Sequence, residues 1–320
     1  MTAPALRYVF FGAESEYVLH PLYLEMKARG YDCIELHATP EHSIGSDIAK
    51  TAADPAPKVL VTSAHFSWDD RYMMSAMEVP DCPALVEIIS LLQPVFTVYT
   101  PHDLSQPLLT NESQCLDLID LFLAPSPVER MFAGGTNVTE VGWIKTPPVS
   151  ETPAERWGRG LWLTISLEYI LIEEGTERTL GYIEPWLHDW LWIKFAPFPQ
   201  FEELEYILKD RGLNVLDRHM TPPEAARHFD FVVTNGESSV VRESAMMGVP
   251  TFLVTDLSLF GDRSTRNIWQ FHDLDNVHVV ETLDQIPHDI TKRSPVLRPF
   301  DMDKAVGAII EGAASAISLR

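Results

Sequence analysis

The stretch VVTNGESSVVRESAMMGVPTFLV, residues 232–254, contains a complete strand–turn–helix–strand pattern. Runs of β-branched and aromatic residues at 231–234 and 251–255 predict two buried strands. Between them lie a polar turn and a helix that we expect over 239–247. Gly248 provides the stop for this helix, and Pro250 prevents it from continuing. Repeats of this pattern build a parallel sheet covered by helices.

The polar turn and the start of the helix form a candidate anion site. Small residues at the carboxyl end of a strand let a ligand approach the backbone, and the free N–H groups of a first helical turn attract a phosphate. Glu243, one turn into the helix, suits an acceptor for ribose hydroxyls. In the alternative interpretation, Asn235 or Ser238 only caps the helix, and Glu243 is solvated. The candidate phosphate-binding residues are Asn235, Gly236, Glu237, Ser238 and Ser239.

The same alternation of strand-like and helix-like segments runs through nearly the whole chain, and it predicts parallel sheets with helices on both faces. Strands are expected at 7–12, 33–37, 58–63, 95–99, 119–124, 138–143, 161–166, 191–195, 214–217, 231–234, 251–255 and 277–280. Helices are expected at 17–28, 202–210, 223–228, 239–247 and 302–317.

A proline-rich segment, residues 145–155, interrupts this alternation and indicates a linker. We therefore expect two doubly wound, Rossmann-like α/β domains, an N-terminal one over 1–147 and a C-terminal one over 148–320. Ligands of open α/β sheets bind at the carboxyl ends of the strands. The predicted site is accordingly a cleft that the two domains face.

The composition of the chain narrows the range of partners and cellular locations that we expect. The formal net charge of −22 would repel a phosphate backbone, so no nucleic acid polymer is expected as a partner. No apolar run approaches the roughly 20 residues of a transmembrane segment. The N-terminus has no cleavable signal pattern, and the three cysteines have no paired spacing. These features favour a cytoplasmic protein.

The N-terminal half offers three candidates for acid–base chemistry. His102 and Asp103 directly follow the predicted strand 95–99, which places them well for general base catalysis on an acceptor hydroxyl. The alternative is a proline turn in which Asp103 caps a helix. Glu14 lies in the segment 12–16 after the first strand and is a second candidate base. That segment lacks a full dinucleotide fingerprint, so a nicotinamide cofactor is not expected.

Residues 230–254 resemble the nucleotide-binding segment in the C-terminal domain of GT-B-fold enzymes. They are similar to the CDP-glycerol glycerophosphotransferase (teichoic-acid polymerase) group and to the non-hydrolysing UDP-N-acetylglucosamine 2-epimerase group. Three other places agree with these families. They are Val141-Gly142-Trp143, the strand end Trp192-Ile193-Lys194 followed by Pro197, and the Arg/Thr-rich segment 261–266.

This resemblance implies a glycosyltransferase that moves a sugar from a nucleotide-activated donor to a hydroxyl acceptor, without a metal and without a further cofactor. Lys194, Arg263 and Ser166 join the expected donor-binding residues. Ala196 stands where the polymerase pattern has a histidine. That departure leaves two other functions open, a nucleotide-sugar epimerase and a non-catalytic nucleotide-sugar-binding module.

Overall fold

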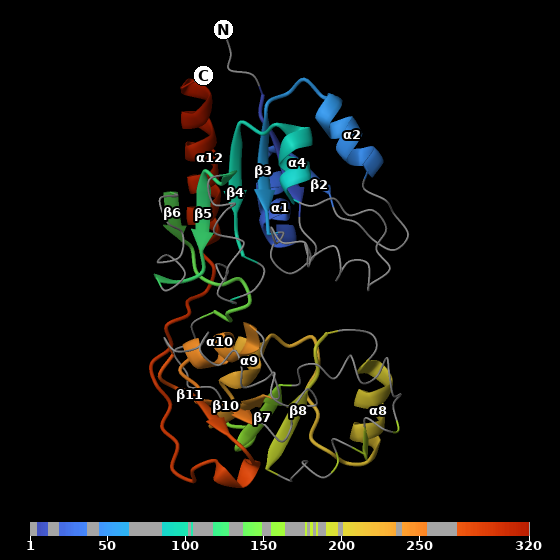
Figure 1. Cartoon of the computed structure of the whole chain (residues 1–320), viewed down its shortest axis with the longest axis vertical. Helices are drawn as coiled ribbons and strands as arrows, with labels where there is room; N and C mark the ends of the chain where they lie inside the picture. The colour runs from blue at the N-terminus through green and yellow to red at the C-terminus, as the bar shows by residue number, and fades with distance from the viewer. Residues whose placement is uncertain are drawn as a thin grey trace. The chain divides into compact units, whose positions relative to one another are not determined.

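The computed structural model divides the chain into two compact units, which are described separately here (Figure 1). Unit 1 comprises Met1–Ile144 together with Pro299–Arg320, and unit 2 comprises Lys145–Arg298. The structure describes residues 5–11, 19–36, 45–63, 85–101, 104, 118–127, 137–148, 155–163, 177, 180–181, 184, 190–197, 201–234, 239–254 and 274–319.

Unit 1 is built on a six-stranded parallel sheet with the strand order β2-β1-β3-β4-β5-β6. The chain runs outward from β1 to β2 and then back across to β3, so the strand order reverses between β1 and β3. The strands are β1 (Arg7–Phe11), β2 (Asp32–Leu36), β3 (Lys58–Thr62), β4 (Phe96–Tyr99), β5 (Leu121–Ala124) and β6 (Asn137–Glu140).

Alternate residues of these strands enter two different cores, one on each face of the sheet. Phe10 and Val98 pack with α1 (Leu19–Ala28) and α12 (Met302–Ser318) on one face. Phe11 and Leu60 pack with α2 (Gly45–Ala53) and α4 (Leu85–Leu92) on the other. Both faces are therefore covered, and the strands are apolar on both sides, as in other doubly wound sheets.

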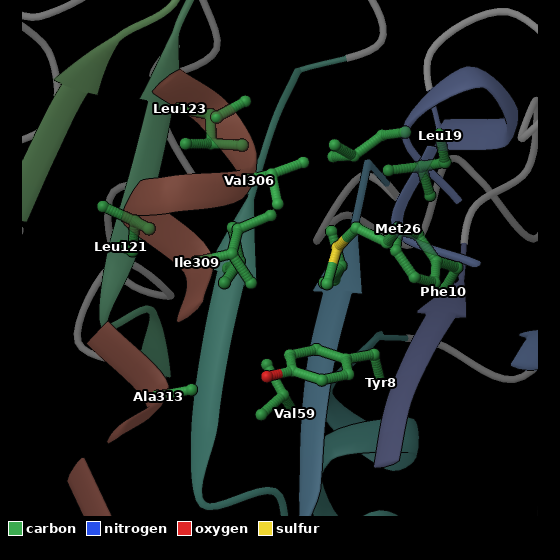
Figure 2. Packing of buried hydrophobic residues seen from close by; sticks show 14 of the residues in the cluster. Tyr8, Phe10, Leu19, Met26, Val59, Leu121, Leu123, Val306, Ile309 and Ala313 are labelled. Carbon is green, nitrogen blue, oxygen red and sulfur yellow. The ribbon is translucent and has the colours of Figure 1, made fainter. Parts of the chain in front are cut away.

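The helix α12 belongs to unit 1, although the sequence predicts a second domain that runs from 148 to 320. Figure 2 shows Val306, Ile309 and Ala313 of α12 in one apolar cluster with Leu121 and Leu123 of β5. An amphipathic pattern determines which face of a helix is buried, but it does not determine which sheet the helix covers. The domain assignment of residues 299–320 is corrected accordingly.

Unit 2 is built on a five-stranded parallel sheet with the strand order β11-β10-β9-β7-β8. Here the strand order reverses between β7 and β9. The strands are β7 (Gly160–Leu163), β8 (Leu191–Lys194), β9 (Phe231–Thr234), β10 (Thr251–Val254) and β11 (Val277–Val280). Two doubly wound α/β domains, as predicted, are thus confirmed.

The two faces of this second sheet are again covered by different elements. Trp162 and Val233 pack with α8 (Glu202–Asp210) and with the short 3-10 turn η6 (Leu283–Gln285). Leu161 and Val232 pack with α9 (Pro222–Ala226) and the residues that follow it. The helix α10 (Ser239–Met246) packs next to α9 and contributes Val241 to a small cluster with Leu253 of β10.

One predicted strand, 214–217, is reduced to a single β-bridge between Val215 and Ile193. The main-chain N–H of Ile193 donates to Asn214, and that of Leu216 donates to Ile193. The carboxylate of Asp217 then accepts from the backbone N–H of His219, which turns the chain away after one pair of ladder bonds.

In the residues that the structure describes, no helix is long and apolar enough to span a bilayer.

Candidate functional site

The candidate site lies at the carboxyl end of the unit 2 sheet, next to the point where the strand order reverses. The strands β7 and β9 are hydrogen-bonded neighbours there, and the chain leaves them in opposite directions across the sheet. Ligands of doubly wound sheets bind at this kind of position. The helix α10 starts at Ser239, which is buried, five residues after β9 ends at Thr234.

Glu243 of α10 is fully buried, with an exposed fraction of 0%. Its Oε1 lies 3.6 Å from Nζ of Lys145, whose side chain is 17% exposed. A carboxylate removed from water needs a paired cation to remain ionised, and Lys145 provides one. The interpretation in which Glu243 is a solvated surface residue is therefore wrong.

The main chain of Lys145 is held by a side chain of its own unit. The hydroxyl of Thr221 donates to the carbonyl oxygen of Lys145 at 2.8 Å. The same hydroxyl accepts from the backbone N–H of Glu224, so Thr221 also caps α9. Because the cap fixes Thr221, it also fixes the backbone from which the Lys145 side chain reaches α10.

Lys194 is the last residue of β8 and is 4% exposed. Its ammonium donates to the carbonyl oxygens of Phe195 and Arg218, each at 3.0 Å. Burial lowers the pKa of Lys194 from 10.5 to about 8; the carboxylate of Glu243 opposes this shift, and the charge of Lys145 adds to it. Lys194, Glu243 and Lys145 therefore form one electrostatically coupled group, which we call the buried charge cluster.

The helix α8 positions the main-chain carbonyl of Arg218, which accepts a hydrogen bond from the Lys194 ammonium. The guanidinium of Arg218 pairs with Glu202. Its Nη1 lies 3.3 Å from Oε2 of Glu205, which is a buried residue. These contacts fix the turn after Asp217, which supplies one of the two acceptors for the Lys194 ammonium. The sequence gives no indication of this support, because Glu202 and Glu205 match an ordinary acidic helix face.

Of the predicted site residues, the structure brings together Lys194 and Glu243 and places Ser239 at the start of the same helix as Glu243. Lys145 was missed as a site residue, because its segment was interpreted only as a linker. The remaining predicted site residues lie outside the described residues: Glu14, His102, Asp103, Ser166, Asn235, Gly236, Glu237, Ser238 and Arg263.

Ala196, at the position where the polymerase pattern has a histidine, is partly buried and packs against the core cluster that contains Phe195. Within the described ranges, no group of three or more His, Cys, Asp or Glu side chains is arranged to hold a metal ion. The buried charge cluster contributes two lysines to the described part of the site, Lys145 and Lys194.

No protein-family model and no curated protein matches this sequence. Among solved structures, an S. aureus MnaA–UDP co-structure is 12% identical, with 99% of this chain and 98% of that chain covered and a TM-score of 0.50. A UDP-GlcNAc 2-epimerase from Methanocaldococcus jannaschii is 11% identical, with 96% and 99% covered and a TM-score of 0.47. The calicheamicin glycosyltransferase CalG4 is 13% identical, with 98% and 91% covered and a TM-score of 0.41.

The likeness to MnaA extends over nearly the whole of both chains and concerns the fold. Together with the two doubly wound parallel sheets, it identifies the architecture of this chain as GT-B-like, as the sequence predicts.

Proposed function

We propose that this protein is a metal-independent glycosyltransferase that binds a nucleotide-activated sugar on unit 2 and transfers the sugar to a hydroxyl acceptor. The observation that carries the proposal is the buried charge cluster at the carboxyl end of the unit 2 sheet. Burying the Glu243 carboxylate and the Lys194 ammonium costs desolvation free energy, so keeping both charges in the interior favours a role in binding or specificity. A donor that carries both a diphosphate and a ribose would use the Lys194 ammonium and the Glu243 carboxylate.

In this proposal, each part of the donor has its own partner. The N–H groups and hydroxyls of residues 236–239 would hold phosphate oxygens, and the carboxylate of Glu243 would accept from the ribose hydroxyls. The ammonium of Lys194 would face the diphosphate. MnaA, whose fold this chain shares, was solved with UDP, and UDP is therefore the first nucleotide to test.

The transfer step needs a base and a stabilised leaving group. The bond between the anomeric carbon and the diphosphate oxygen breaks, and the electron pair leaves with the diphosphate. The acceptor oxygen bonds to the anomeric carbon, and its proton passes to His102 or Asp103 of unit 1, with Glu14 as the alternative base. Lys194 stabilises the negative charge that develops on the departing diphosphate.

Calorimetry of UDP binding near pH 8.5 in two buffers with different ionisation enthalpies tests the role of Lys194. The pKa of about 8 leaves a large fraction of Lys194 neutral at that pH, and a bound diphosphate favours the charged form. We expect wild type to take up a large fraction of one proton on binding, whereas Lys194→Met takes up none. Binding without proton uptake by wild type would remove Lys194 from the donor site.

A panel of UDP, CDP, GDP and dTDP sugars, followed first by thermal shift and then by turnover with hydroxyl acceptors, tests the function as a whole. We expect one nucleotide to raise the melting temperature, and its sugar to be transferred equally well in the presence of a chelator. His102→Ala or Asp103→Ala should lower kcat far more than nucleotide affinity. If no nucleotide changes the melting temperature, the proposed function is wrong.

Ala196 favours a second candidate, a nucleotide-sugar-binding module that has lost catalysis. An alanine packed against the core offers no hydrogen-bond donor to a donor phosphate at the position of the family histidine. Such a module would bind a nucleotide sugar tightly and would turn over no donor, with or without an acceptor. An epimerase, the third candidate, would change the bound sugar without any acceptor, and product analysis distinguishes the three.

A further inference from the structure

Lys145 has no role in the proposed donor site, yet its side chain contributes a cation to the interior of that site. Its Nζ lies 3.6 Å from a carboxylate that is fully buried, while its own side chain is 17% exposed. A surface ion pair would leave both groups in water and would contribute little to stability. This pair has one wholly desolvated member, so the loss of the lysine would remove a counter-charge from a buried carboxylate.

The backbone of Lys145 is fixed within unit 2, which limits the freedom of the lysine to leave the carboxylate. The carbonyl of Lys145 accepts from the hydroxyl of the N-cap residue Thr221. This anchoring predicts that the ammonium approaches Glu243 from one direction, which leaves the orientation of the carboxylate defined.

The second lysine of the cluster cannot serve as a constant counter-charge. Lys194 donates to two main-chain carbonyls and changes its charge near pH 8. Among other charged groups, Arg242 lies on α10 itself and is buried, and α9, which packs against α10, carries Glu224. Lys145 is the lysine whose ammonium the structure places within ion-pair distance of the Glu243 carboxylate.

We propose that Lys145 is a positioning residue of the donor site, which keeps the Glu243 carboxylate ionised and oriented so that it accepts both ribose hydroxyls. This inference rests on the proposed role of Glu243. An ionised carboxylate offers acceptor sites on both oxygens, whereas a protonated one has become a donor on one of them. Lys145 therefore sets the preference for a ribonucleotide over a deoxyribonucleotide without touching the ligand.

The first test needs no ligand and measures the pair by a thermal-unfolding cycle of wild type, Lys145→Met, Glu243→Gln and the double variant. Lys145→Met should lower Tm by roughly 10 °C, and Glu243→Gln in the same chain should restore most of the loss. Additive effects of the two substitutions would overturn the inference.

The second test compares the affinities for UDP and dUDP. Wild type should prefer UDP at least tenfold, Lys145→Met should lose most of this preference, and Lys145→Arg should restore it. Lys50→Met removes an exposed lysine that pairs only with Asp47 on its own helix, and it should leave both affinities unchanged.

The outcomes separate the two proposals. If wild type binds UDP and Lys145→Met keeps the full preference for UDP over dUDP, the inference about Lys145 fails and the proposed function stands. If wild type binds none of the nucleotides in the panel, the proposed function fails, and the inference fails with it even when the unfolding cycle shows strong coupling.

Discussion

The ammonium of Lys194 donates to the main-chain carbonyl of Arg218 at 3.0 Å, and two carboxylates of α8 hold Arg218 by its guanidinium. A buried lysine in the sheet is thus fixed through a turn that a surface helix supports. The arrangement separates two tasks, because α8 determines where the ammonium lies, whereas burial lowers its pKa to about 8.

The lowered pKa of Lys194 predicts how stability depends on pH. The folded-state pKa of about 8 lies below the unfolded value of 10.5, so between these two pH values the unfolded chain binds the extra proton and stability rises with pH. Relative to Lys194→Met, wild type should gain about 3 kcal/mol of unfolding free energy over this interval. Urea titrations at pH 7.5, 9 and 10.5 measure the gain, and parallel pH profiles of the two proteins would contradict it.

Ser239 and Glu243 should affect different ligands. Ser239→Ala removes one hydroxyl near a bound phosphate and should weaken UDP roughly tenfold while uridine binding is unchanged. Glu243→Gln should weaken UDP and uridine by the same factor, because both carry the ribose. Calorimetry with the two ligands gives the comparison. If both variants bind like wild type and only Tm falls, the start of α10 has a structural role alone.

Gly248 and Gly212 provide a matched pair of glycines with left-handed backbone. Their φ values are +78° and +79°, but a Cβ at Gly248 would lie 2.1 Å from the carbonyl oxygen of Arg293, whereas a Cβ at Gly212 meets nothing within 4 Å. Gly212→Ala should cost about 1–2 kcal/mol for its φ alone. Gly248→Ala should cost clearly more, and equal losses in chemical denaturation would show that the 293–294 segment moves aside freely.

Gly312 and Gly307 offer a second pair, both within α12. A Cβ at Gly312 would lie 2.3 Å from the ring of Phe96, which is buried in unit 1, whereas Gly307 has open space around it. Gly307→Ala should stabilise the protein by about 1 kcal/mol through helix propensity. Gly312→Ala should destabilise it. The opposite signs, measured by thermal unfolding, test the packing of α12 on the unit 1 sheet, and stabilisation by both variants would contradict that packing.

Much of the fold could be predicted from the sequence, because its strands are short apolar runs bounded by turn residues. The strand 231–234 and the helix stop at Gly248 agree with the structure. The predicted strand 214–217 failed because Val215 and Leu216 secure only one bridge before Asp217 turns the chain. Local patterns reveal a strand's propensity, but they do not show whether a partner strand is within reach.

The site was predictable where a side chain follows a strand, and not where tertiary contacts define it. Glu243 was identified from its position one turn into a helix that follows a strand, and Lys194 from the resemblance of its strand end to GT-B-fold enzymes. The contact of Glu243 with Lys145 and the support of Lys194 by Arg218 both join segments far apart in the sequence. No local pattern encodes such pairs, and the burial that makes them energetically important appears only in the folded chain.

The position of α12 in unit 1 also sets an order for biosynthesis. A ribosome delivers β1 to β6 first, then the whole of unit 2, and α12 only afterwards. Until then, the sheet face that includes Val98 and Leu121 lacks one of the helices that cover it. Unit 2 can therefore fold while unit 1 still lacks α12. The exposed apolar face of the unit 1 sheet must be kept from aggregating until the residues of unit 2 and α12 have been translated.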